Sequence, residues 1–141
     1  ANIIPDSFKA ELLKGTHNFA SSGGDSFKLA LYTDISSLSA STTAFTTTNE
    51  VSTSGTNYTS GGNALTNSGV SVASNTAFID FADLTFSSVT LSAVGAMIYN
   101  DDNSDKICLI LDFGGTKTAT NGDFIIQFPA AGASTAIFRI A

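Results

Sequence analysis

LSAVGAMIY (residues 91–99) is the first of four apolar segments in the C-terminal half of the chain, followed by KICLILDF (106–113), DFIIQF (123–128) and AIFRI (136–140). Short stretches rich in Asn, Asp, Gly and Ser separate these segments. Apolar segments of this length between turn-forming residues are typical of β-strands. They predict a β-sheet body, with hairpin loops at residues 100–105, 114–122 and 129–135.

Three further segments upstream have strand character. Residues 27–33 (FKLALYT) alternate with period two, residues 63–73 contain spaced valines, and residues 77–89 are apolar around a turn at Asp83. Together these segments predict a mainly β, single-domain protein of residues 1–141, folded as an antiparallel β-sandwich or flattened barrel of about seven to eight strands. The predicted core consists of one consistent face of each alternating strand and contains Phe27, Leu29, Leu31, Ile107, Leu109, Leu111, Phe124, Ile126 and Phe128.

The N-terminal residues 1–15 predict an arm and one short helix. Asp6 or Ser7 is expected to cap a helix that runs through FKAELLKG (residues 8–15), and Gly15 is expected to end it. Two helical turns are not stable alone in water, so the apolar side of the helix must dock on the sheet or on a neighbouring subunit. We therefore assign Ile3, Ile4, Phe8 and Leu12 to a predicted interface.

Residues 34–62 form a long excursion that is rich in Ser and Thr. Long segments without secondary structure in compact domains are usually functional or mobile. The few apolar residues of this excursion are spaced too irregularly for one strand, which favours a role as anchors against a partner. The predicted interface accordingly also includes Ile35, Leu38, Phe45 and Tyr58, and the alternative is a poorly ordered surface loop.

Composition excludes several classes of function. The net charge is −6 and the six basic residues are scattered from Lys9 to Arg139, which argues against nucleic-acid binding. No apolar run reaches the roughly 18 residues of a membrane helix, and residues 1–5 do not resemble a signal peptide, so we expect a product made in the cytoplasm. Cys108 is the only cysteine and is expected to be a small core residue.

Two short motifs imitate functional sites. Asp101, Asn103 and Asp105 have the spacing with which a calcium loop begins, but the loop glycine is missing, and we expect an acidic hairpin turn. The DFGG of residues 112–115 matches the letters of the kinase magnesium motif without any of its companion elements, so we interpret its glycines as turn residues. No metal site and no cofactor are predicted.

Catalytic residues are not apparent either. His17 is the only histidine and is expected to be a hydrogen-bonded surface or turn residue, which leaves no Ser-His-Asp or Cys-His set with a recognisable motif. Asp80, Asp83 and Asp112 could supply a pair of carboxylates of the glycosidase kind, but the chain has no Trp and few Tyr for stacking on a sugar. We therefore predict a protein that is not an enzyme and has no catalytic residues.

Several segments, distributed along essentially the whole chain, resemble one protein family in their sequence and in their order. These segments are ELLKG (11–15), FKLALYT (27–33), NEVS (49–52), YTSGGNALTN (58–67), GAMIY (95–99), DFGG (112–115) and DFIIQFP (123–129). The chain resembles small virion structural proteins encoded by tailed bacteriophages and prophages. Members of this family are similar to capsid decoration (cement) proteins more than to enzymes.

The resemblance implies a non-enzymatic function in the virion, assembled in the host cytoplasm. We expect a head decoration protein that binds the major capsid protein on the outer surface of the shell and stabilises it. A closed homo-oligomer is expected, with a trimer as the first choice and a monomer as the second. The alternative is a tail or tail-fibre adhesion module that contacts the host surface.

Overall fold

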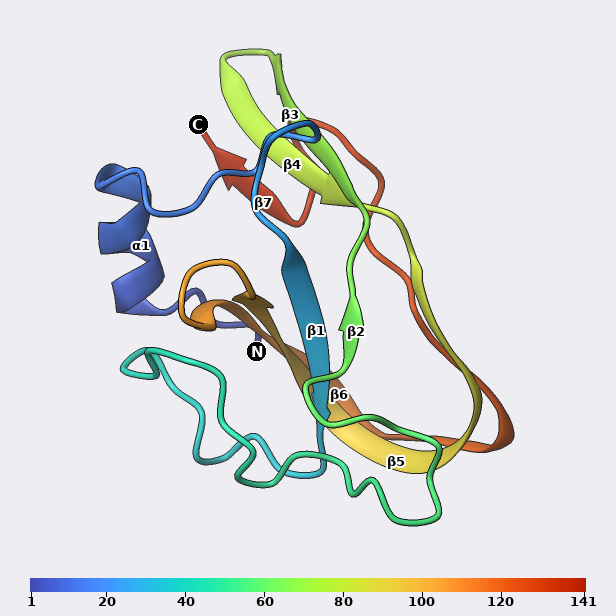
Figure 1. The fold of residues 1–141 in the computed structure, drawn as a ribbon. Helices are drawn as coiled ribbons and strands as arrows, with labels where there is room; N and C mark the ends of the chain where they lie inside the picture. The colour runs from blue at the N-terminus through green and yellow to red at the C-terminus, as the bar shows by residue number, and fades with distance from the viewer.

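The computed structural model describes residues 1–141 and contains one helix and seven strands. Their bounds are α1 (Asp6–Leu13), β1 (Phe27–Tyr32), β2 (Asn63–Ala64), β3 (Asn67–Ala73), β4 (Thr76–Phe81), β5 (Leu84–Asn100), β6 (Lys106–Ile126) and β7 (Phe138–Ile140). The strands form a four-stranded antiparallel sheet of order β2-β1-β5-β6 and a three-stranded antiparallel sheet of order β3-β4-β7 (Figure 1). The predicted mainly β, sandwich-like fold with one short N-terminal helix is confirmed.

The main core joins the two sheets. A cluster of 23 buried residues includes side chains of β1, β5 and β6 from the larger sheet and of β4 and β7 from the smaller one. Phe81 of β4 contacts Phe27 of β1 with ring centroids 6.0 Å apart, and Phe128 with centroids 5.6 Å apart. All nine residues that the sequence predicted for the core are buried.

A second core lies on the opposite face of the four-stranded sheet. Its seven buried residues are Ala30, Tyr32, Leu38, Met97, Tyr99, Ile107 and Ile110. Leu38 comes from the excursion of residues 34–62, and Ile35 and Phe45 of the same excursion pack against this cluster. The central sheet is thus covered on both faces, which is why five of the six residues of β1 are buried instead of every second one.

β5 and β6 form one long hairpin, which corrects two of the predicted loops. The turn at residues 101–105 is present, but residues 117–122 pair with residues 89–93 of β5, so residues 114–122 are not a hairpin loop. Threonine-rich residues 116–120 favour the extended conformation, and the extra residues beside Val94 form a bulge in which Gly114 has φ +75°. Residues 129–135 connect one sheet to the other and are not a hairpin loop either.

One β-bulge in β6 places a predicted core residue, Ile107, on the other face of the sheet. Ile98 pairs with Leu109 but Tyr99 pairs with Ile107, so Cys108 is an extra residue in β6. Leu109 and Leu111 therefore belong to the core between the sheets, whereas Ile107 lies in the second core. The prediction that these three residues share one face was wrong because strict alternation does not survive a bulge.

The helix begins earlier than predicted. α1 covers Asp6–Leu13, its N-cap is Pro5, and no side chain caps it, so the predicted cap by Asp6 or Ser7 is wrong. Gly15 has φ +72° just after the helix, as a left-handed C-terminal stop requires. No helix of the chain has the length and apolar character that crossing a membrane requires.

Candidate functional site

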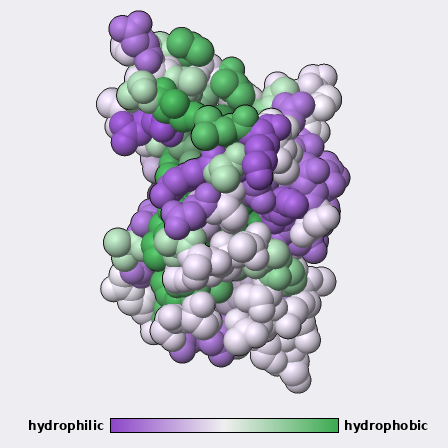
Figure 2. Space-filling view, turned by 90° about the vertical axis from the view of Figure 1, so that its left-hand side faces the viewer, coloured by the Kyte–Doolittle hydropathy of each residue, from purple (hydrophilic) through white to green (hydrophobic).

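An apolar hollow in the surface lies between α1 and the three-stranded sheet (the small sheet), on the inner face of that sheet, which packs on the main core; we call it the α1 groove. It has a volume of about 780 Å³. Eleven of its sixteen lining residues are hydrophobic; the lining consists of Ile4, Phe8, Lys9, Leu12, Leu13, Gly15, His17, Asn18, Phe19, Val70, Ala77, Phe78, Ile79, Phe138, Arg139 and Ile140. Figure 2 shows apolar side chains gathered on the upper part of this side of the molecule.

A buried polar cluster fixes the wall of the α1 groove. His17 lies between Glu11 of α1, whose Oε1 is 3.0 Å from Nε2, and Asn100 of β5, whose Nδ2 is 3.0 Å from Nδ1. Because an amide nitrogen only donates, Nδ1 accepts and Nε2 carries the proton that is donated to Glu11. The expected surface location of His17 is therefore wrong: this residue is buried and joins the helix to the sheet.

Asp25 extends the same cluster. Its Oδ2 accepts hydrogen bonds from the Asn18 backbone N–H (2.8 Å) and from the side-chain amides of Asn100 (2.9 Å) and Asn103 (3.1 Å). These bonds tie the segment between α1 and β1 to the β5–β6 turn. The helix side of the groove is thus positioned by charge-assisted hydrogen bonds, although α1 is too short to be stable alone.

Cys108 contacts this cluster but is not arranged for nucleophilic chemistry. Its Sγ lies 3.9 Å from His17 Nδ1, and the residue is completely buried, as expected for a small core residue. Burial, together with the nearby Glu11 and Asp25 carboxylates, raises the pKa of the thiol well above its usual value. The reactive thiolate is therefore suppressed.

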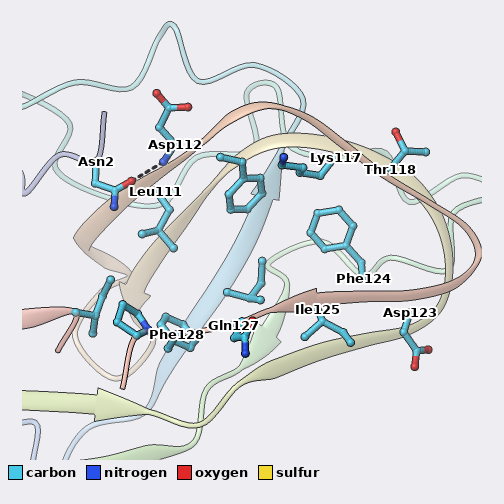
Figure 3. A pocket seen from close by; sticks show the side chains of 14 residues that line it. Asn2, Leu111, Asp112, Lys117, Thr118, Asp123, Phe124, Ile125, Gln127 and Phe128 are labelled. Carbon is cyan, nitrogen blue, oxygen red and sulfur yellow. Dashed lines mark hydrogen bonds between the residues drawn. The ribbon is translucent and has the colours of Figure 1, made fainter. Parts of the chain in front are cut away.

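A second cavity of about 520 Å³ lies where the β5–β6 hairpin bends (Figure 3). Its apolar lining includes Leu111, Phe124 and Phe128, and its rim carries Lys117 and Asp123. It is smaller than the α1 groove, and half of its lining residues are hydrophobic. Its polar groups come from different parts of β6 and from the N-terminal arm.

The three carboxylates that were candidates for a catalytic pair make separate contacts. Asp112 accepts hydrogen bonds from the Ala1 amine and from Gly114 N–H (2.9 Å), and the first of these chiefly lowers its pKa. Asp83 Oδ1 accepts from Phe128 N–H at 2.9 Å. No hydrogen bond joins Asp80, Asp83 and Asp112 to one another.

The acidic turn uses its side chains for hydrogen bonds to the segment before β1. Asp102 Oδ2 accepts from Ser26 N–H at 2.7 Å, Asn103 donates to the Thr16 carbonyl at 3.0 Å, and Ser104 and Asp105 have positive φ. No group of three or more His, Cys, Asp or Glu side chains in the chain is placed to hold a metal ion.

The predicted interface residues of the N-terminal arm have different surroundings. Ile3 forms a backbone bridge to Ile110 at the edge of β6, with both N–O distances at 2.9 Å. Phe8 is buried against Phe138, and Leu12 is partly buried against the main core. Of this set, Ile4 is exposed at the α1 groove, and the arm as a whole is attached to its own chain.

The four predicted interface residues of the excursion pack on their own chain. Leu38 and Tyr58 are buried, and Ile35 and Phe45 are partly buried against the second core. Glu50 holds the excursion as well: its carboxylate accepts hydrogen bonds from Tyr58 Oη (2.8 Å), Ser60 Oγ (2.8 Å) and Gly61 N–H (2.7 Å). The excursion is a covering layer, so the buried anchors have no free surface to offer a partner.

The residues that form the most exposed apolar surface are different ones. Leu13, Val70, Val72 and Ile140 are large, apolar and exposed at or beside the α1 groove. Their sequence signal is weak, because Val70 and Val72 have the alternation expected of an ordinary half-buried strand.

Comparison with protein-family models, curated proteins and solved structures finds no match for this chain.

Proposed function

We propose that this chain is a non-enzymatic structural protein of a bacteriophage virion, namely a decoration protein of the head. The resemblance of its ordered segments to small phage virion proteins supports the class. The major capsid protein is the proposed partner on the outer surface of the shell, and a closed homo-oligomer, with a trimer as the first choice, is the proposed assembly.

One observation carries the binding role: the α1 groove is an open apolar surface on a chain that otherwise encloses its core. Both faces of the four-stranded sheet are covered, yet Leu13, Val72 and Ile140 are left exposed. An apolar patch of this kind marks a site of interaction with another molecule. On a capsid lattice, many such contacts act together, so modest affinity at each site yields firm attachment.

A binding experiment on particles tests the proposal. Purified protein added to capsids that lack it should co-sediment with them until it reaches a copy number set by the number of capsid subunits. Gel densitometry of virions gives that number, and electron microscopy gives the position. A copy number fixed by tail symmetry, with density on the tail, would favour the alternative of a tail or tail-fibre module instead.

A further inference from the structure

The inner face of the small sheet carries two apolar rows that run across its three strands. In the antiparallel register Val70 is opposite Ile79 and Ile79 is opposite Phe138, and one row further Val72, Ala77 and Ile140 are aligned in the same way. Residues directly opposite one another in a sheet point to the same face. The six side chains therefore form one continuous apolar floor.

The chain itself covers only part of the first row, because Val70 at its β3 end is 56% exposed. Phe138 packs against Phe8 of α1 with ring centroids 5.1 Å apart, and Ile79 is buried. In the second row Val72 is 73% exposed and Ile140 is 63% exposed, and on the helix side Leu13 is 92% exposed. The apolar face of the small sheet thus extends beyond the part that α1 covers, and the α1 groove lies at this boundary.

The charged residues in the lining of the α1 groove are both basic. The lining of the α1 groove includes Lys9 and Arg139 and no carboxylate, although the chain has a net charge of −6. Lys9 forms an exposed ion pair with Asp6 at 3.2 Å. Arg139 lies on the face of β7 opposite to Phe138 and Ile140, at the edge of the sheet; its guanidinium donates one hydrogen bond, to the Ala133 carbonyl at 3.5 Å, and forms no ion pair.

The edge of the small sheet provides a third feature. β7 pairs with β4 on one side and has no strand on its other side. An unpaired strand edge beside an apolar floor is the arrangement that accepts an extended segment of another protein, since the backbone supplies affinity and the side-chain pockets supply selectivity.

We propose that the α1 groove binds an extended segment of a partner protein, with apolar side chains on the sheet floor and a carboxylate against Arg139. This rests on the proposed function in that the partner is the capsid protein. A second copy docked groove to groove is a poorer occupant because it would place its own Arg139 at the same rim, and like charges oppose such a symmetric contact.

Matched variants test the site on capsids. Ile140→Glu and Arg139→Glu change exposed groove residues, and each should weaken capsid binding at least about tenfold. Ile125→Glu and Lys117→Glu are the controls, since Ile125 is 59% exposed and both residues line the second cavity. The controls should bind within about twofold of wild type. Loss of binding in the controls and not in the groove variants would overturn the proposal.

A second experiment separates the groove from the proposed function. A random peptide library displayed on yeast is selected against the wild-type chain. The selected peptides should alternate apolar residues and contain Asp or Glu, shift the amide resonances of residues 70–72, 77–79 and 138–140, and fail to bind Ile140→Glu. Failure of wild-type protein to bind any capsid, together with such peptides, rejects the proposed function while the groove assignment stands.

Three results would reject the groove assignment itself. These are a library that yields no peptide, selected peptides that bind Ile140→Glu as well as wild type, and selected peptides that are basic. Sedimentation velocity checks the remaining occupant: self-association that Ile140→Glu abolishes would assign the α1 groove to a second copy.

Discussion

At the scale of single residues, the three tyrosines of the chain all donate hydrogen bonds to the excursion of residues 34–62. Tyr32 Oη donates to the Thr46 carbonyl at 2.6 Å, Tyr58 Oη to Glu50 at 2.8 Å, and Tyr99 Oη to the Gly61 carbonyl at 2.6 Å. Burial is the largest influence that raises the pKa of each phenol above its usual value of 10.0. The covering layer therefore depends on protonated tyrosines.

This dependence predicts alkaline unfolding. The folded chain retains phenol protons that the unfolded chain releases above about pH 10, so this contribution to the free energy of unfolding is complete below that pH and is lost as the pH rises above it. Tyrosinate absorbance should therefore appear together with the loss of near-ultraviolet circular dichroism. The urea-unfolded chain is the control and should titrate near pH 10. Tyrosines that ionise there with the fold intact would contradict the prediction.

Leu109 gives a direct measure of the core between the sheets. Its side chain is 2% exposed, so Leu109→Ala removes buried methyl groups and should lower the free energy of unfolding by about 2–5 kcal/mol. Ile125→Ala, at an exposed position of the same strand, should change it by less than about 0.5 kcal/mol. Urea denaturation measures both values, and equal losses in the two variants would mean that the faces of β6 are assigned wrongly.

At the scale of elements, Gly62 marks a close approach between β1 and the segment before β2. Its φ is +76°, and a Cβ there would lie 1.8 Å from the carbonyl oxygen of Leu29 in β1. Gly55 has a similar φ of +71° with nothing within 4 Å of the same position. The two glycines share the backbone conformation and differ in the space around them.

The pair therefore separates conformational strain from steric overlap. Gly55→Ala should cost about 1 kcal/mol for its left-handed backbone alone. Gly62→Ala should cost several kcal/mol more, because β1 must move away from the segment before β2. Urea denaturation of both variants checks this, and similar losses would show that the backbone at Gly62 adapts easily.

The excursion of residues 34–62 should be protected from hydrogen exchange in the free protein. Phe45 N–H donates to the Asp105 carbonyl at 2.9 Å and Val51 N–H donates to the Leu31 carbonyl at 3.0 Å, which fixes the excursion to both sides of the sheet. These amides should exchange much more slowly than those of Thr47 and Thr53, which make no hydrogen bond within the chain. Fast exchange at all four amides would mean that the layer is mobile.

Much of the element pattern could be predicted from the sequence. The apolar segments at residues 27–33 and 106–113, the turn at 101–105 and the stop at Gly15 all have local signals, and the structure has each of them. The bulges had no such signal, because an extra residue such as Cys108 changes the facing of its neighbours without changing the composition. The paired residues 117–122 were predicted as a loop because the stretch 114–122 contains turn-forming Gly and Asn residues.

At the scale of the whole molecule, the candidate site could not be predicted because it depends on which apolar residues are left uncovered. The irregular anchors of the excursion suggested a partner surface, but the second face of the sheet needed them as its cover. Val72 and Ile140 looked like ordinary strand residues, yet the cover ends before it reaches them. Whether an apolar strand residue is exposed depends on how far the neighbouring segments extend over the sheet. The periodicity of the sequence carries no information about that extent.

The burial of Cys108 allows chemical modification of its thiol to measure local opening of the structure. The single thiol lies against His17 beneath the segment that joins α1 to β1, and it is fully buried. Because the sulfur is fully buried, a thiol reagent reaches it only when the structure around it opens, so the modification rate measures local opening, including movement of α1 and of the segment after it. A molecule bound in the α1 groove that holds α1 against the small sheet would lower the rate of thiol modification without contacting the sulfur.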